Sequence, residues 1–478
     1  MKRAAAGAWW SPSIHHYIYS EAHIRPEGSG DRSLKSKVFF MDDRYTGMAS
    51  SIPAKADQLF DHAGLSECFD RGDSVAIKCH MGEWNNSAYL RPIQVRVIVD
   101  KVKEHGGVPF VTDTTTAPYY YYGARSTAAL YLESAARNGF TAQSMGCPII
   151  IADGMYGTED VKVDIPDGVI LKEAYLAKGI ADADAMIVVS HFKGHGSGVY
   201  GGGIKNVAIG CSSKRGKFNV HICTHPEVGW NHWSFQGDNC VGEECPDHVL
   251  CSNICPVGAI KIKEDHAEYD PETCIGCFGH QRLLFRCDLW GRENYDDWRQ
   301  WFLVAMGDAA SGYVRHIGEE NIGYISYALD ITPACDCVPG SDRPVIPNLG
   351  VFASKDMVAI DVAALDMSDK SAGIPGSMAE TKNVMNPGDE KFTAIVGMSQ
   401  WITANTCVHL GSGSKDYELV VPPVSGDEAK FAHHLFSPER PSGWYLGKAM
   451  GRFGTWTPPG GYKYNPKPTV SIEELSKR

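Results

Sequence analysis

One stretch decides the fold class: RPIQVRVIVDKVKEHGGVPFVT, at residues 91–112. Pro92 suits a first helical turn, apolar residues then recur at near-helical spacing, and Gly106-Gly107 ends the helix before an apolar strand at 109–112. The alternation extends in both directions, with further strands at 73–78, 148–152, 185–189, 321–327 and 350–353 and helices at 126–137 and 356–366. Apolar strands that alternate with helices predict an α/β fold, in which a mostly parallel sheet is covered by helices on both faces.

Length and charge limit the functional classes. The 478 residues suffice for about two to four domains. Lys and Arg number 45 against 57 Asp and Glu, a formal net charge of −12, which argues against a nucleic-acid binder because such proteins carry a basic face. No apolar run approaches the roughly 18 residues of a membrane span, and residues 1–13 lack the apolar stretch of a signal peptide. We therefore expect a cytoplasmic protein without a membrane span.

Seven of the 15 cysteines fall between residues 240 and 287. In a reducing compartment, such thiols favour metal binding or catalysis over disulfides. A bacterial ferredoxin run has the spacing C-x2-C-x2-C-x3-C-P. In this chain Cys245, Cys251 and Cys255 occupy the first, third and fourth cysteine positions of that run. His248 stands at the second position, where the run has a cysteine. The spacing therefore predicts a ferredoxin-like iron–sulfur insertion, in which soft thiolates bind iron.

In such a run the fourth cysteine binds the other cluster, so the ligands cross between two sites. One predicted set consists of Cys245, Cys251 and Cys287 with either Cys240 or His248. The other consists of Cys255, Cys274 and Cys277, with or without His280. Seven thiols for eight positions predict one or two [4Fe–4S] clusters. Structural zinc is the alternative, because two C-x2-C-like pairs can also bind zinc.

Titratable side chains follow three of the predicted strands. In open α/β sheets, ligands bind beyond the carboxyl ends of the strands, so we expect these side chains to share one pocket. The predicted catalytic residues are Lys78, His80, Asp113, His191, His195 and Lys205. Lysines would hold a small anionic substrate or cofactor, and histidines would transfer protons near neutral pH.

A glycine-rich segment, HGSGVYGGGIKN, spans residues 195–206. It contains a literal G-x-G-x-x-G, but a dinucleotide site also needs an acidic residue about 20 positions on, and no suitable one follows. Backbone N–H groups ahead of a lysine can still bind phosphate or carboxylate groups. The predicted cofactor-binding residues are Gly196, Gly198, Gly201, Gly202, Gly203 and Lys205. A plain turn before a helix is the alternative.

Cys335-Asp336-Cys337 places two thiols close together after a strand end. Together with another loop these two cysteines would bind a metal, so Cys335 and Cys337 are predicted metal ligands. The alternatives are a redox-active pair and two buried thiols.

The chain divides into five predicted segments. Proline and glycine become more frequent after about residue 411, which indicates a wrapping tail. The segments are an N-terminal arm at 1–45, an α/β domain in two parts at 46–235 and 291–410, the ferredoxin-like insertion at 236–290 and the C-terminal tail at 411–478.

Several motifs in a fixed order resemble the iron–sulfur-centre branch of the domain-of-unknown-function 362 family. They are the cysteine cluster, KCHMGEWNNSAYLRP at 78–92, PFVTDTTT at 109–116, SHFKGHGSGVYGGGIKN at 190–206, DITPACDC at 330–337 and NLGVFASKDMVAIDVAALD at 348–366. The insertion of that family usually has eight cysteines, and this chain departs from the pattern at His248 and His280.

The spacing of His195, Lys205 and His221 is similar to the segment of lactate racemases that holds a nickel-pincer nucleotide. This resemblance implies that Lys205 tethers the cofactor, that His195 is an acid/base and that His221 binds nickel. A nickel-pincer-type cofactor, or another additional metal, is therefore a second cofactor prediction.

Clustered thiols and clustered His and Lys together predict an anaerobic oxidoreductase. Its clusters would pass single electrons from a carrier protein of the ferredoxin or flavodoxin type to the pocket. One alternative is a racemase-like metalloenzyme with structural clusters. Another is an electron-transfer subunit without its own substrate, which an apolar pocket would favour. A homo-oligomer is compatible with each interpretation.

Overall fold

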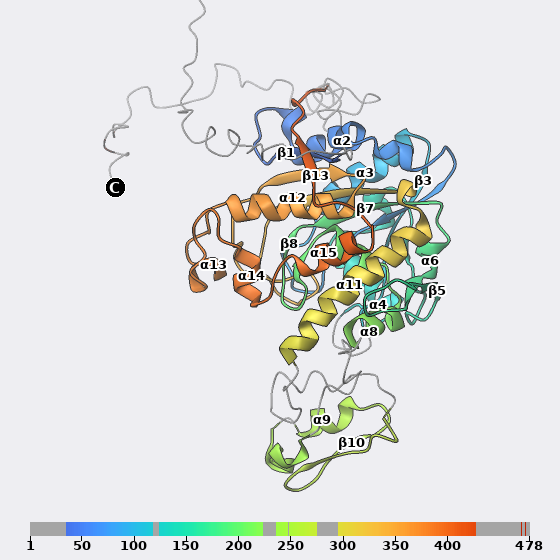
Figure 1. The fold of residues 1–478 in the computed structure, drawn as a ribbon, viewed down its shortest axis with the longest axis vertical. Helices are drawn as coiled ribbons and strands as arrows, with labels where there is room; N and C mark the ends of the chain where they lie inside the picture. Colours follow the sequence, from blue (N-terminus) through green and yellow to red (C-terminus); the bar gives the residue numbers. More distant parts are fainter. Residues whose placement is uncertain are drawn as a thin grey trace, which may run out of the picture. The chain divides into compact units, whose positions relative to one another are not determined.

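An eight-stranded sheet organises the α/β body (Figure 1). The computed structural model describes residues 35–117, 124–222, 236–246, 248–274 and 295–426, with the single residues 470 and 474. In spatial order the strands are β14 (Tyr417–Val420), β1 (Ser36–Asp42), β13 (Gly350–Ser354), β12 (Ile322–Ala328), β7 (Ala185–His191), β2 (Ser74–Lys78), β3 (Val108–Asp113) and β4 (Ile149–Ile151). Neighbours pair in parallel except where β13 meets β12 and β1. The predicted mostly parallel sheet is confirmed.

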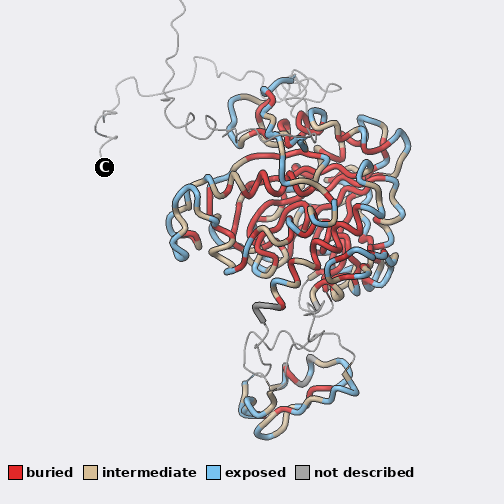
Figure 2. The backbone as a smooth tube through the Cα atoms, in the orientation of Figure 1, coloured by how far each residue is buried: buried red, intermediate tan, exposed pale blue. Residues whose placement is uncertain are grey.

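Both faces of the sheet are buried, as continuously apolar strands require. Along β7, Ile187 and Val189 join one apolar core, while Met186 and Val188 join the other. Helices α2 (Ile52–His62), α3 (Pro92–Glu104) and α4 (Ala128–Arg137) pack on the first face. Helices α7 (Gly203–Ala208), α11 (Tyr295–Ile317), α12 (Met357–Lys370) and α15 (Ile402–His409) pack on the second. Figure 2 shows the buried backbone concentrated in these layers.

Capping residues and proline mark the positions at which the helices begin. Pro92 occupies the first turn of α3, as predicted. Helix α12 begins after Asp356, whose side chain accepts the N–H groups of Val358 and Ala359. The helix predicted at 126–137 starts two residues later, because Thr127 is the residue whose side chain accepts the Leu130 N–H.

The two terminal segments each contribute a strand to the sheet. Strand β1 lies within residues 1–45, which were predicted to form an N-terminal arm. That prediction is wrong for residues 36–42, because they form a strand of the sheet. The reason is that β13 and β14, both distant in the sequence, pair with β1 on its two sides and bury Val38 and Phe40. Strand β14, in the predicted tail, pairs in parallel with β1. Residues 1–34 and 427–469 lie outside the described part of the chain.

The remaining elements are short. Two antiparallel hairpins pair β5 (Asp160–Asp164) with β6 (Glu173–Ala177) and β8 (Lys193–His195) with β9 (Val199–Gly201). The short helices are α5 (Ala142–Met145), α6 (Lys178–Ala181), α8 (Lys214–Ile222), α13 (Met378–Thr381) and α14 (Lys391–Val396). The predicted insertion contains helix α9 (His248–Ile254) and the hairpin of β10 (Ile260–Ile262) with β11 (Ala267–Tyr269). Of the helices in the described ranges, none has the length and apolar character needed to cross a bilayer.

Strand β8 packs tightly against the loop that carries Cys335. The Gly194 N–H donates to the Thr332 carbonyl at 2.8 Å. A Cβ atom at Gly194 would stand only 2.4 Å from the carbonyl oxygen of Pro333. This contact therefore requires glycine, and it holds the loop beside the carboxyl end of β7.

We expect Gly194→Ala to lower the free energy of unfolding by about 1–3 kcal/mol, because the added methyl group meets backbone that cannot move aside. Gly196→Ala is the matched control, since nothing lies within 4 Å of a Cβ atom there. That substitution should change stability by no more than about 0.5 kcal/mol. Urea unfolding of the full chain measures both, and equal effects would contradict the tight contact.

Candidate active site

A cavity of about 500 Å³ lies at the carboxyl ends of the strands. Strands β2, β3 and β7 each end in a residue that lines it, because parallel strands bring these ends to one edge. The lining includes all six side chains predicted as catalytic, namely Lys78, His80, Asp113, His191, His195 and Lys205. It also includes His221, Cys335 and Cys337. The sequence thus located a shared pocket, while the roles of these residues stay predictions.

Sequence reasoning missed three other polar groups of the lining: Arg125, Asn206 and Lys217. Asn206 follows Lys205 directly, and Lys217 lies four residues before His221 on helix α8, where side chains share one face. These two neighbours were therefore detectable. Arg125 comes from the loop before α4, and no sequence pattern relates it to the strand ends.

Lys78 and Asp113 form a buried ion pair, with Nζ and Oδ1 2.8 Å apart. Lys78 also donates to Asn206 Oδ1 at 2.7 Å, and the Tyr131 hydroxyl donates to Asp113. Burial alone would raise the pKa of Asp113, but the nearby charge of Lys78 holds that pKa at about 2. Asp113 is therefore ionised at neutral pH, and the geometry favours a positioning role for the pair.

His191 is held at both ring nitrogens. Nδ1 lies 2.8 Å from Asp336 Oδ1, and Nε2 lies 2.6 Å from the Leu329 carbonyl oxygen. A neutral imidazole has only one N–H, so two acceptors favour the doubly protonated ring. Lys193 Nζ lies 3.2 Å from the other oxygen of Asp336. The geometry therefore favours His191 as an anchor for Asp336 rather than as a proton carrier.

Hydrogen bonds also define the tautomers of three other histidines. His80 Nδ1 accepts the Gly82 N–H at 2.9 Å, so its proton is on Nε2, which has no partner among the described residues. His195 Nδ1 accepts the N–H groups of Gly198 and Ser197, at 2.7 and 3.2 Å. His221 Nδ1 lies 2.6 Å from the Lys217 carbonyl and must donate to it. Burial lowers the pKa of all three rings, to about 3 for His80 and His221.

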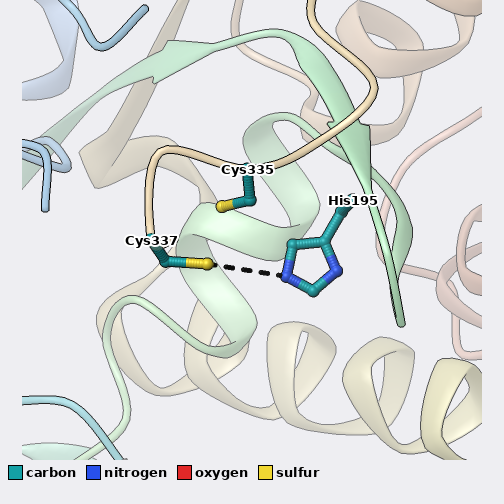
Figure 3. A group of neighbouring side chains, drawn as sticks. All are labelled: His195, Cys335 and Cys337. Atoms are coloured by element: carbon teal, nitrogen blue, oxygen red, sulfur yellow. Dashed lines mark hydrogen bonds between the residues drawn. The ribbon is translucent and has the colours of Figure 1, made fainter. Parts of the chain in front are cut away.

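Cys335 and Cys337 lie beside His195 in the lining of the cavity, and the sulfur of Cys337 is directed at the His195 ring (Figure 3). The two Sγ atoms and a ring nitrogen of His195 lie within 4.8 Å of one another. Lys205 Nζ lies 3.5 Å from Cys335 Sγ, and His195 Nε2 lies 3.9 Å from Cys337 Sγ. A hydrogen bond from Cys337, together with the charge of Lys205, holds the pKa of Cys335 well below its ordinary value despite burial. The hydrogen bond and burial raise the pKa of Cys337.

Two lysines of this cavity have no carboxylate partner among the described residues. Lys78, Arg125 and Lys193 pair with Asp113, Glu83 and Asp336 respectively. No ion pair within the described ranges involves Lys205 or Lys217. Lys217 Nζ donates to the Thr114 hydroxyl and, at 2.6 Å, to the Ser212 carbonyl. The cavity therefore suits a ligand that brings negative charge.

Residues 75–366, more than half of the chain, match the family model described as Domain of unknown function (DUF362). The chain belongs to the DUF362 family. The match spans the strand-end motifs from Lys78 to Asp366 that suggested the resemblance.

Comparison with other proteins adds little to the DUF362 assignment. No curated protein matches the chain. Among solved structures, the lactate racemase apoprotein from Thermoanaerobacterium thermosaccharolyticum is similar with a TM-score of 0.32 and 11% sequence identity. That similarity covers 87% of this chain and 90% of the racemase chain. A TM-score of this size carries no argument, so the nickel-pincer resemblance of the DUF362 chain stays a prediction.

The glycine-rich segment of this DUF362 protein forms the β8–β9 hairpin and the start of α7. Gly196 and Gly202 line the cavity, whereas Gly198, Gly201 and Gly203 are not among its lining residues. The N–H groups of Gly203 and Ile204 donate to the buried carboxylate of Asp361, at 2.7 and 2.9 Å. Two of the backbone N–H groups that were predicted to bind an anionic ligand therefore donate to Asp361 instead. The positively charged groups of the cavity are lysine side chains and Arg125.

The DUF362 chain presents five of its predicted cluster cysteines in the described part: Cys240, Cys245, Cys251, Cys255 and Cys274. Backbone N–H groups of Gly242 and Ala259 point at the sulfurs of Cys240 and Cys255, at 3.3 and 3.1 Å. Such N–H···S contacts suit thiolate ligands of iron–sulfur clusters. The predicted ligands Cys277, His280 and Cys287 lie outside the described residues.

Lys217→Met tests the protonation state of the cavity. Burial lowers the pKa of Lys217 to about 7 in the folded chain, whereas the pKa of an exposed lysine in the unfolded chain is about 10.4. At any pH between these two values, Lys217 binds a proton in the unfolded chain but not in the folded chain. Stability therefore rises with pH across this range and is lost as the pH falls toward 7. We expect a smaller rise in the free energy of unfolding between about pH 7 and 9 in Lys217→Met than in the wild type.

The matched control for this prediction is Lys382→Met, which changes an exposed lysine. Its pH dependence in urea unfolding should equal that of the wild type. An unchanged slope in Lys217→Met would show that this amine is not buried in the neutral form.

Proposed function

We propose that the protein is an iron–sulfur oxidoreductase that acts on a small anion bound at the strand ends. The observation that carries this proposal is the cavity itself, in which Lys205 and Lys217 lack acidic partners among the described residues and two thiols face a histidine. Perturbed titratable groups gathered in one pocket are typical of an active site. The two lysines without acidic partners favour an enzyme with its own anionic substrate over an electron-transfer subunit without one.

Each group of the cavity has a role in this proposal. Lys205 and Lys217 bind the anion, and Lys217 releases a proton readily because burial lowers its pKa to about 7. His195 is oriented by two backbone N–H groups so that its Nε2–H can donate a proton inside the cavity. Trp298 and Phe302 form an apolar part of the lining and exclude water.

The cysteine-rich segment fits a cluster-binding role by its donor set. Seven thiols with ferredoxin-like spacing, two of which accept backbone N–H groups, would hold one or two [4Fe–4S] clusters. Such clusters supply single electrons when bound. We further propose a ferredoxin- or flavodoxin-type carrier as the electron donor, and a cytoplasmic location. A homo-oligomeric assembly remains part of the proposal.

A second candidate is a metallocofactor enzyme of the nickel-pincer type. The observation that favours it is that Lys205, His195 and His221 line one cavity. His221 donates from Nδ1 to a backbone carbonyl, which is the tautomer that metal-binding histidines commonly adopt. In this candidate Lys205 would tether the cofactor, His195 would act as acid/base and His221 would be the metal ligand.

Metal and sulfide analysis of anaerobically purified protein tests the iron–sulfur proposal. We expect about four or eight iron atoms per chain with matching acid-labile sulfide. Cys255→Ala should remove about four of them, whereas Cys68→Ala, a buried thiol away from the cluster, should remove none. Zinc without sulfide would overturn the proposal. Stoichiometric nickel with an added mass on Lys205 would place the second candidate first.

Anion binding tests the cavity. We expect oxalate, sulfate or inorganic phosphate to raise the thermal unfolding temperature, because a ligand at 100 times its Kd adds about 2.7 kcal/mol of stability. Oxamide, the neutral analogue of oxalate, should have no such effect. Lys205→Met and Lys217→Met should lose the response, and Lys382→Met should keep it. Equal responses to oxalate and oxamide would contradict a charge-selective site.

A further inference from the structure

Cys335 and Cys337 stand at the first and third positions of a tight turn. The Val338 N–H donates to the Cys335 carbonyl at 3.2 Å, which closes a four-residue β-turn. A disulfide joins residues whose Cα atoms are about 4.4–6.8 Å apart, a separation that the first and third residues of a turn satisfy. The two Sγ atoms already lie within 4.8 Å of each other. The turn therefore brings two thiols to a distance from which they can form a bond.

The turn is held from several sides. Asp336, between the two cysteines, contacts His191 and Lys193 through its carboxylate, and its carbonyl accepts the Glu83 N–H at 3.0 Å. Arg125 donates to the Cys337 carbonyl at 3.2 Å. These contacts fix the backbone around the thiols, so closing or opening a bond between the sulfurs needs little movement elsewhere.

Each sulfur has a different polar neighbour. Lys205 Nζ lies beside Cys335, where a positive charge favours the thiolate, which is the nucleophilic form of cysteine. His195 Nε2 lies beside Cys337, where an N–H can supply a proton to sulfur. By contrast, burial raises the pKa of two other thiols, Cys211 and Cys407, to about 12. The asymmetry between Cys335 and Cys337 is that of an attacking and a resolving thiol.

The orientation of His195 weighs against a metal ion bound between the same three side chains. A histidine that binds a metal usually donates its remote N–H to a carbonyl or a carboxylate. Here the remote nitrogen, Nδ1, instead accepts two backbone N–H groups, so the proton is on the nitrogen that faces Cys337. A metal ion would have to displace that proton and leave the ring as an imidazolate.

We propose that Cys335 and Cys337 form a redox-active pair that cycles between dithiol and disulfide inside the cavity. In the oxidising direction the Cys335 thiolate and the Cys337 thiol form one S–S bond, the S–H bond of Cys337 breaks, and two electrons and one proton pass to an anionic oxidant bound beside Lys205. In the reducing direction the S–S bond breaks as two electrons from a ferredoxin- or flavodoxin-type carrier and one proton restore the Cys335 thiolate and the Cys337 thiol. The pair thus collects two single electrons for a two-electron reduction. This step rests on the proposed function for its substrate, but the pair can be tested without one.

Thiol trapping of the full-length protein tests the pair. The tryptic peptide at residues 316–355 contains Cys335 and Cys337 and no other cysteine, because Pro344 blocks cleavage after Arg343. After anaerobic reduction and removal of the reductant, both thiols should be alkylated. After mild oxidation with diamide, the peptide should be two hydrogens lighter and unalkylated, and dithiothreitol should reverse the change.

Three kinds of variant sharpen this test. Cys335→Ser and Cys337→Ser should each abolish the internal disulfide, whereas Cys68→Ser should leave it unchanged. In the Cys337→Ser background, Lys205→Met should slow alkylation of Cys335 severalfold, because it removes the positive charge 3.5 Å from the sulfur, and Lys205→Arg should restore the rate. A purely structural role for Lys205 would not produce this rescue.

Two results would overturn the inference: alkylation of both thiols after oxidation, or stoichiometric zinc that is lost in Cys335→Ser. Iron and sulfide measured on the same samples separate this inference from the proposed function. A reversible disulfide without iron would support the pair and contradict the iron–sulfur proposal. Iron and sulfide without a disulfide would support the iron–sulfur proposal and contradict the pair.

Discussion

The carboxylate of Asp336 holds the candidate site together. It contacts His191 at 2.8 Å and Lys193 at 3.2 Å, and all three side chains are buried. These contacts join the carboxyl end of β7 and the start of β8 to a turn that lies 145 residues further along the chain from His191. Removing one member of a buried ion pair costs about 3–5 kcal/mol, because the remaining charge is left uncompensated. This carboxylate therefore makes the buried charge contacts that hold the turn, and both thiols with it, beside β7 and β8.

Charge matching explains which groups are structural and which are available to a ligand. Buried charges are costly unless they are paired, and Lys78, Arg125 and Lys193 each have a carboxylate partner. Within the described part of the chain, Lys205 and Lys217 contact a sulfur, a hydroxyl and a carbonyl instead. Burying lysines without a carboxylate partner departs from what stability alone would favour, and departures of this kind are expected at functional sites.

The sequence predicted the positions of the site better than their roles. Strand ends are local features, so Lys78, Asp113 and His191 could be placed at one edge of the sheet from hydrophobic pattern alone. The roles depend on partners far along the chain. Nothing near His191 in the sequence indicates that both of its nitrogens are occupied. Similarly, Asp361, which takes the N–H donors of the glycine-rich segment, lies about 160 residues away from Gly203. Strand β1 was missed because its partner β13 is also distant.

By itself the sequence determined the α/β class, the set of residues at the strand ends and the ferredoxin-like cysteine spacing, because periodicity, turn residues and ligand spacing are properties of short segments. Only the tertiary structure decided which cations are matched by acids, which nitrogen of each histidine carries a proton and which groups stand beside Cys335 and Cys337. Protonation and charge pairing depend on distances of a few ångströms between atoms. Those distances are set where β2, β7, β8 and the turn at Asp336 meet in the folded chain.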